Sequence, residues 1–304
     1  MGTPQFAVPC LAALCHAADI DVVGVVTSPD KAAGRGQHLQ GSAVKKYALE
    51  QGLPILQPGK LRDPIFLEQL HDLRPDLQVV VAFRMLPTAV FELPPLGTIN
   101  LHASLLPQYR GAAPINWAII NGERETGLTT FFIGKEIDTG NIIAQTRMPI
   151  GEHETAGELH DRMMVTGTEL LLQTVFSIAQ GKCPSIPQSN SPDLRPAPKI
   201  FSDTCRINWH KTPHEVCNLI RGLSPYPAAL AQLNGKTFKV LKARPIVEEH
   251  GHSVGKIVSD HRRFLHVAVP GGYVELLEVQ PESKRAMSVQ DFLNGNKQGL
   301  EVFL

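Results

Sequence analysis

The sequence has few cysteines, and they stand in no pattern that serves metal or disulfide chemistry. Five cysteines occur among 304 residues, and no two are spaced as C-x-x-C. An odd number without zinc-ligand spacing argues against a disulfide framework and against a structural zinc site. The twelve histidines are scattered, so His250 and His252 are interpreted as part of a polar loop. We expect no bound metal and reduced, mostly buried thiols.

Long hydrophobic runs are also lacking. No stretch of about 18 apolar residues occurs, which excludes an ordinary transmembrane helix. The chain does not open with a signal segment of basic, then apolar, then small residues, so export is not expected. Together with the unpaired cysteines, these absences predict a cytoplasmic protein that binds no membrane.

The chain as a whole carries no net charge, since 29 basic residues balance 29 acidic residues. The balance differs between its two parts. Residues 1–198 contain 15 Lys and Arg against 19 Asp and Glu, whereas residues 199–304 contain 14 against 10. The second part is therefore suited to face a polyanion, although so small a difference also arises by chance.

The first part of the chain alternates short apolar runs with helical stretches. Residues 21–27 and 77–83 are valine-rich and almost continuously apolar, as in strands that are covered on both faces. Residues 42–51 and 65–73 have the character of helices between such strands. This alternation predicts an α/β domain with a doubly wound, mostly parallel sheet of the Rossmann-like type.

A proline-rich segment divides the chain. Residues 181–198 carry five prolines, which cannot donate hydrogen bonds to a helix or a sheet and keep a segment extended. We predict a first domain at 1–181, a linker at 182–198 and a second domain at 199–304. About five short alternating runs in the second domain, with turns such as Asn234-Gly235, predict a small β-barrel, for which an OB-like barrel is one candidate.

One group of polar side chains follows a predicted strand at 97–101. Asn100 and His102 are two positions apart and therefore emerge on one face, and Asp138 lies in a later Asp-Thr-Gly turn. An amide that stabilises an oxyanion, an imidazole that takes a proton and a carboxylate that orients it suit acyl transfer to an amine. The same residue types also serve as caps and turn residues without any chemistry.

Two further features bear on the reaction and on its substrate. The chain has no G-x-S-x-G elbow and no cysteine in a basic context, so we expect direct transfer without a covalent enzyme intermediate. The basic loop Gly34-Arg35-Gly36 suits a phosphate backbone, although such loops also occur as plain surface segments.

The longest motif extends from Asn100 to Ile115 and contains Asn-x-His-x-Ser-Leu-Leu-Pro; Glu136 to Gly140 follow later. Both stretches resemble the 10-formyltetrahydrofolate-dependent formyltransferases, and the similarity covers nearly the whole chain. Other stretches resemble the members of that family that act on methionyl-tRNA. These stretches are Gly2 to Ala7, Pro29 to Gly36, Ile207-Asn208-Trp209, Pro225-Tyr226-Pro227 and Met287 to Leu293.

The resemblance implies that a formyl group moves from 10-formyltetrahydrofolate to the α-amino group of methionine on initiator tRNA, in support of translation initiation. It also implies a catalytic first domain and a tRNA-binding, OB-like second domain. The residues that it assigns are Asn100, His102 and Asp138 to catalysis; Ser104, Leu105, Leu106 and Pro107 to the folate site; and the loop with Lys31 and Arg35 to the acceptor end of the tRNA. Lys199 and Arg206 are further candidates for contacts with the tRNA, although such residues also occur as plain solvated surface.

Two other functions are consistent with parts of this pattern. A formyltransferase that acts on an amino sugar nucleotide shares the Asn-x-His-x-Ser-Leu-Leu-Pro core and a similar barrel, but the Gly34-Arg35-Gly36 loop and the tail at 287–293 argue against it. The second alternative is a non-catalytic folate- or RNA-binding protein whose first domain is incomplete.

One departure from the family concerns the first strand. In the family an apolar strand runs directly into the Gly-Thr-Pro turn, whereas here Met1 directly precedes Gly2-Thr3-Pro4. That strand is central in a doubly wound sheet, so we expect the runs at 22–26 and 79–81 to be exposed edges. We hypothesise that Met1 is an internal methionine of a longer product, and we expect low solubility and poor activity of the shorter chain.

Overall fold

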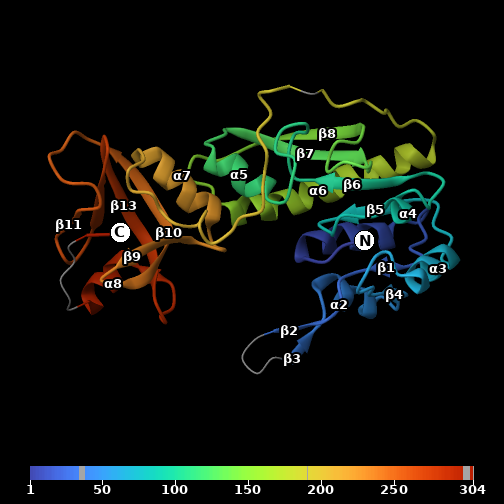
Figure 1. Ribbon diagram of the computed structural model, residues 1–304, viewed down its shortest axis with the longest axis horizontal. Coiled ribbons are helices and arrows are strands. Elements are labelled where there is room, and N and C mark those ends of the chain that lie inside the picture. Colours follow the sequence, from blue (N-terminus) through green and yellow to red (C-terminus); the bar gives the residue numbers. More distant parts are fainter. Residues whose placement is uncertain (34–37, 190, 297–301, 304) are drawn as a thin grey trace. The chain divides into compact units, whose positions relative to one another are not determined.

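The computed structural model describes residues 1–33, 38–189, 191–296 and 302–303. They form two compact units (Figure 1). The first unit comprises Met1–Gly111, Thr126–Met148 and His160–Pro196, and the second comprises Ala112–Glu125, Pro149–Leu159 and Ala197–Leu304. Most of the proline-rich segment, up to Pro196, thus belongs to the first unit. The domain limits given by the sequence stay a prediction.

The first unit contains the expected α/β sheet. Strand β5 pairs with β6 in parallel, β6 pairs with β7 in antiparallel orientation, and β8 lies beyond β7. A separate parallel pair joins β1 with β4, and an antiparallel hairpin joins β2 with β3. The strands are β1 (Val25–Val26), β2 (Lys31–Ala33), β3 (His38–Gln40), β4 (Ile55–Leu56), β5 (Gln78–Val81), β6 (Thr98–His102), β7 (Glu125–Phe132) and β8 (Ile142–Pro149).

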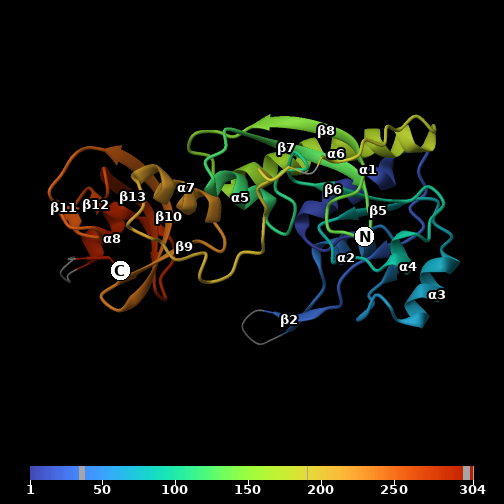
Figure 2. The ribbon, with the colours of Figure 1, turned by 45° about the horizontal axis from the view of Figure 1, so that its top comes forward.

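Helices cover both faces of this sheet. Helix α6 runs along one face (Figures 1 and 2). There Gly167 lies against the side chains of Leu101 and Leu128, where a larger residue would collide with Leu101. On the other face, Phe66 of α3 and Phe91 of α4 join a buried cluster with residues of β1 and β5. The helical elements are η1 (Gln5–Ala7), α1 (Val8–His16), α2 (Ala43–Glu50), α3 (Pro64–Asp72), α4 (Thr88–Phe91) and α6 (Ala156–Ala179).

Local sequence signals define where α2 and α3 begin. The Ser42 hydroxyl accepts the Lys45 N–H at 3.0 Å, and the Asp63 carboxylate accepts the Ile65 N–H at 3.0 Å. Pro64 occupies the first turn of α3, where a missing N–H costs nothing. Capping of this kind starts each helix at a fixed residue and so supports the strand–helix alternation that the sequence predicts.

Met1 and Gly2 lie between β1 and β5. The Met1 amino group donates to the Val79 carbonyl at 2.6 Å, and the Val81 N–H donates to the Met1 carbonyl at 3.0 Å. On the other side, the Gly2 N–H donates to the Val26 carbonyl at 3.0 Å. These two residues link the strand pairs, so the expectation of exposed edges is wrong for Val26 and Val81, which are buried.

The predicted strand at 21–27 is shorter than expected, because only Val25–Val26 pairs with β4. Residues 22–26 face residues 77–79 and 81 across an apolar cavity of about 530 Å³, which we call the β1–β5 slot. The N–H and C=O of one strand residue point to the same side, so the Val26 and Val79 N–H groups face the slot. Neither has a hydrogen-bond partner among the described residues.

The second unit is built on an antiparallel sheet with the order β11–β12–β13–β10–β9, and β14 pairs with β13. Asn234 and Gly235 both have positive φ angles, as the predicted hairpin turn between β9 and β10 requires. The elements are α5 (Pro114–Ile120), α7 (Pro213–Leu223), β9 (Ala229–Leu233), β10 (Lys236–Val247), β11 (Ile257–Ser259), β12 (Leu265–Val269), β13 (Gly272–Pro281), β14 (Met287–Ser288) and α8 (Val289–Gly295).

The core of the second unit lies between this sheet and α7. A reciprocal capping box starts α7, because Thr212 and Glu215 bond each other's backbone N–H groups. Val302 forms an isolated β-bridge with Lys256, next to β11, and Phe303 forms one with Leu233 of β9. Residues 302–303 thus contact the strands at the two edges of the sheet. The structure shows an antiparallel β domain in the predicted place. Closure of that sheet into a barrel is not seen among the described strand pairings.

All five cysteines are free, and Cys10, Cys205 and Cys217 are buried, which confirms the expectation of mostly buried thiols. Burial raises the pKa of Cys217 to about 12. No helix in the described part of the chain is long and apolar enough to cross a membrane. The described residues also hold no group of three His, Cys, Asp or Glu side chains able to bind a metal.

In a chain that starts at Met1, the amino group of this residue should make stability depend on pH. Its desolvation in the slot lowers its pKa from 8.0 to about 5. Between these values the unfolded chain binds a proton that the folded chain does not, so the free energy of unfolding falls as the pH falls from 8 to 5. The loss is at most about 4 kcal/mol.

N-terminal acetylation removes this titration. We therefore expect denaturant unfolding at pH 8 and pH 5 to show a smaller pH dependence for the acetylated chain than for the chain with a free amino group. Equal pH dependence of the two forms would contradict the desolvation of this group.

Candidate active site

Strand β6 carries Asn100 and His102 at its carboxyl end. It lies between β5 and β7, with Asn100 paired to Val80 on one side and to Phe131 on the other. His102 is paired with Thr129 and is almost fully buried, whereas Asn100 is half-buried. The carboxyl end of a central strand is where open α/β sheets place their ligands. The sheet therefore holds both side chains at the position that the motif predicts.

The loop that follows β6 folds back onto that strand. His102 Nε2 lies 2.9 Å from the Tyr109 carbonyl oxygen, and the Ser104 hydroxyl donates to the Gln108 carbonyl at 2.6 Å. Thr129 of β7 fastens the middle of the loop, because its hydroxyl donates to the Ser104 carbonyl and accepts the Leu106 N–H. The loop is thus a fixed structure rather than a free connection.

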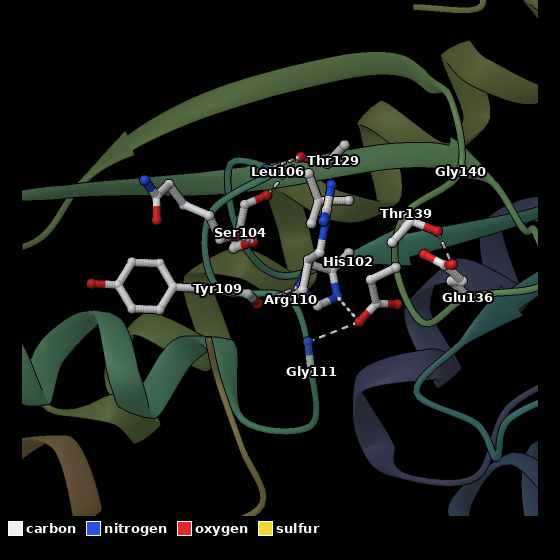
Figure 3. A network of polar contacts seen from close by, with 12 residues as sticks. His102, Ser104, Leu106, Tyr109, Arg110, Gly111, Thr129, Glu136, Thr139 and Gly140 are labelled. Atoms are coloured by element: carbon white, nitrogen blue, oxygen red, sulfur yellow. Dashed lines mark hydrogen bonds and ion pairs between the residues drawn. The ribbon is translucent and has the colours of Figure 1, made fainter. Parts of the chain in front are cut away.

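Asp138 comes from the turn between β7 and β8 and meets this loop. Its Oδ2 accepts the Gly111 N–H at 2.9 Å and lies 3.8 Å from His102 Nδ1 (Figure 3). The side chains of His102 and Asp138 are only 6% and 14% exposed, so the pair is shielded from water. The structure thus brings His102 and Asp138 together, as predicted. Among the described residues, no hydrogen bond joins the Asn100 side chain to His102 or Asp138. Asn100 and His102 lie on the same strand, two positions apart.

Asp138 adopts a left-handed backbone conformation, with φ of 54°. Such a conformation costs most residues other than glycine on the order of 1 kcal/mol, and Asp tolerates it better than most because it is a common turn residue. The contacts of the Asp138 carboxylate with the Gly111 N–H and of its carbonyl with Gln188 also hold this turn.

Hydrogen-bond roles fix which nitrogen of His102 carries its proton. The Tyr109 carbonyl only accepts, so Nε2 must be the donor in the 2.9 Å contact. Nδ1 is then the nitrogen that can gain or lose a proton, and it faces the Asp138 carboxylate. The ring is also packed edge-on against Phe131, with centroids 6.4 Å apart. The arrangement holds one orientation of the imidazole and leaves one nitrogen for chemistry.

The Asn100 side-chain amide has no hydrogen-bond partner among the described residues, and it is not fully buried. A half-buried amide at a strand end is thus available to donate to an oxygen of a bound molecule. This is the property that an oxyanion-stabilising group needs.

The four residues predicted to line a folate site all lie in the fastened loop. Ser104 and Leu106 are buried, and their polar groups bond within the protein: Gln145 Nε2 donates to the Leu106 carbonyl at 2.9 Å. Leu105 and Pro107 are half-buried. The structure therefore leaves apolar surface of Leu105 and Pro107 for a ligand, while Ser104 and Leu106 shape the loop.

The predicted tRNA contacts are spread over both units. Lys31 is exposed in β2, and Arg35 lies outside the described residues. Lys199 and Arg206 are exposed in the second unit, where Lys199 lies over the Phe201 ring and Arg206 lies 3.6 Å from an Asp203 carboxylate oxygen. Lys31 thus belongs to the first unit, and Lys199 and Arg206 belong to the second.

Two glutamines of the site escape any analysis of the sequence alone. Gln145 bonds the Leu106 carbonyl and the Thr129 hydroxyl, and Gln188 bonds Arg110 and the Asp138 turn. Gln188 comes from the proline-rich segment, which sequence analysis treats as a linker. No motif marks either residue, because their partners lie 16 to 78 positions away.

Comparison with known proteins relates both units to one family. The model of the formyl transferase family matches residues 1–175, and that of the formyl transferase C-terminal domain matches residues 199–297. The methionyl-tRNA formyltransferase of Parabacteroides distasonis is 52% identical over 98% of this chain and 95% of its own length. That of Flavobacterium johnsoniae is 48% identical over 97% and 94%.

Solved structures show the same fold at much lower identity. The sugar 3N-formyl transferase WlaRD superimposes with a TM-score of 0.67 at 22% identity, covering 93% of this chain and 97% of its own. An N-formyltransferase from Helicobacter canadensis gives 0.69 at 22% identity, covering 92% and 97%. At this identity the likeness concerns the fold alone. With about half of all residues identical over nearly the full length, the chain belongs to the methionyl-tRNA formyltransferase family.

Proposed function

We propose that this chain transfers a formyl group from 10-formyltetrahydrofolate to the α-amino group of methionine on initiator tRNA, by direct attack of the amine. The observation that carries the site assignment is the His102–Asp138–Gly111 contact beside the partner-free Asn100 amide. Family membership supports the donor and the acceptor. Because charged initiator tRNA is used by the ribosome, we place the reaction in the cytoplasm.

Each residue of the site has a distinct task. Asn100 donates from its amide to the formyl oxygen as that oxygen gains negative charge during amine attack. His102 Nδ1 takes the proton that the attacking amine loses and returns it to the leaving nitrogen of the donor. Asp138 keeps the imidazole in one orientation and opposes the positive charge that forms on it. The products are a formamide and tetrahydrofolate, so no oxidant or external acid is required.

The loop after β6 suits a donor with an uncharged ring. Leu105 and Pro107 offer apolar surface there, and the unused Asn100 amide offers a polar contact at the end of β6. The chemistry supplied by the bound donor is an activated formyl group. We therefore propose that Leu105 and Pro107 contact the donor, and that Ser104 and Leu106 hold the loop in shape for it.

The second unit is proposed to bind the tRNA. Residues 199–304, which make up most of this unit, carry 14 basic and 10 acidic residues, and this excess favours contact with a phosphate backbone. Lys199 and Arg206 are exposed there, and the sheet with its bridges through Val302 and Phe303 is consistent with an OB-like barrel. Lys31 belongs to β2 of the first unit. Lys31 and Arg35 are proposed as contacts with the acceptor end.

The choice of acceptor can be tested directly. We expect the 304-residue chain to transfer labelled formyl from 10-formyltetrahydrofolate to methionine-charged initiator tRNA and not to an amino sugar nucleotide in a parallel reaction. Labelled product is separated and counted for each acceptor. Transfer to the sugar alone would contradict the proposed acceptor, and transfer to neither would contradict the activity of this chain.

Substitution of Asn100 and His102 should separate binding from turnover. Asn100→Ala removes the oxyanion donor, and His102→Gln keeps a donor for the Tyr109 carbonyl but removes the base. We expect kcat to fall about 100-fold or more in each variant, with donor affinity nearly unchanged. Steady-state kinetics with the tRNA and donor titration followed by fluorescence measure the two quantities.

The exposed amide of Gln180, at the end of α6, offers a matched control. Gln180→Ala should retain the parent kcat and the parent thermal unfolding midpoint. A His102→Gln variant that keeps its kcat would exclude His102 from the proton transfer. A variant that loses its thermal midpoint along with kcat would point to a folding defect, and His102→Asn then provides a second substitution of the same position.

A further inference from the structure

The Gln188 side chain joins the two segments that meet at Asp138. Its Oε1 accepts from Arg110 Nε at 3.0 Å and from Arg110 Nη2 at 2.7 Å. Its Nε2 donates to the Asp138 carbonyl at 2.9 Å and to the Gly140 carbonyl at 2.7 Å. Arginine only donates and carbonyls only accept, so this amide has one possible orientation. The Gln188 amide thus accepts two hydrogen bonds and donates two.

The segment around Gln188 is fastened along the site rather than free. Ile142 and Ile186 exchange two backbone hydrogen bonds at 2.8 and 2.9 Å next to the Asp138 turn. At the other end, the Tyr109 N–H donates to the Arg195 carbonyl at 2.7 Å, and Gln108 Oε1 accepts the Arg195 N–H at 2.8 Å. The proline-rich segment thus contacts both the loop after β6 and the turn that carries Asp138.

Neither family model covers this segment, because the first ends at residue 175 and the second begins at residue 199. Asp138 nevertheless depends on it. The carboxylate of Asp138 faces His102 from a left-handed turn, and two of the bonds that hold this turn come from Gln188. The Gly111 N–H, which the carboxylate accepts, follows Arg110, the other partner of Gln188.

We propose that Gln188 is a positioning residue for the reaction: it holds the Asp138 turn and Arg110 together, so that the Asp138 carboxylate stays between the Gly111 N–H and His102 Nδ1. Gln188 touches no reacting atom in this role. The proposal rests on the proposed function of Asp138, and it assigns a task to a segment that the sequence presents as a connection between domains.

Two substitutions separate the two halves of the Gln188 contact. Gln188→Met has a similar length and makes none of the four bonds, whereas Gln188→Glu retains an acceptor for Arg110 and loses both donated bonds to the Asp138 turn. We expect kcat to fall about 10- to 100-fold in both variants, because a small misplacement of a catalytic group costs that much. KM for the tRNA should stay within about twofold, since no substrate contact is lost.

The neighbouring exposed Ser189 provides a control, and Ser189→Ala should keep the parent kcat. A Gln188→Glu variant with the parent kcat would overturn the proposal, because only the Arg110 contact would then matter. A double-mutant cycle with Asp138→Asn gives a second criterion. If Gln188 acts through Asp138, the combined loss is smaller than the product of the single losses, and independent effects would also overturn the proposal.

A measurement without substrate distinguishes this proposal from the proposed function. In the parent chain the Gly111 N–H is bonded to Asp138, so its amide hydrogen exchange reports whether the carboxylate is in place. We expect Gln188→Met to speed this exchange at least about tenfold, while Ser189→Ala leaves it unchanged. Unchanged exchange in Gln188→Met would refute the positioning role even if the chain proved to transfer no formyl group.

Discussion

The hydrogen bond from the Gly111 N–H to the Asp138 carboxylate joins two segments that lie 27 positions apart in the chain. The loop after β6 can close around His102 because this bond holds its far end, while the Tyr109 carbonyl holds Nε2 of the imidazole. The carboxylate in turn stays beside Nδ1 because the same bond uses one of its oxygens. The orientation of the histidine and the shape of the loop are thus set by one shared contact.

Much of the site could be predicted from the sequence, because its residues lie at defined positions in a strand. Asn100 and His102 are two positions apart on one strand, so their common end of the sheet follows from strand geometry. The valine-rich run at 77–83 predicted β5 for the same reason. Asp138 was predicted from its Asp-Thr-Gly turn, and a turn residue of this type tolerates the left-handed backbone that it adopts, but the turn alone does not show that its carboxylate faces His102.

Other parts could not be predicted, because they depend on contacts between distant segments. Gln188 lies among prolines, whose usual meaning is an extended linker, and nothing local shows that Arg110 and the Asp138 turn are its partners. The run at 21–27 was predicted as a full strand from its composition. Only Val25–Val26 pairs, because β4 contains just Ile55 and Leu56, and the β1–β5 slot supplies no second neighbour for residues 22–24.

The slot has a consequence for the cooperativity of the first unit. The first unit has two groups of strands on either side of the slot: β1 with β4, and β5 through β8. Among the described residues, backbone hydrogen bonds connect these groups only through Met1 and Gly2. Separation of the smaller group therefore breaks few backbone hydrogen bonds, and its main cost is the loss of the apolar contacts that Val26 and Phe66 share with Val80. It is a local opening that costs less than global unfolding, because the β5–β8 sheet stays intact. Because β6 and its loop belong to the larger group, such an opening leaves His102 and Asp138 in contact while it exposes valine-rich edges to other chains.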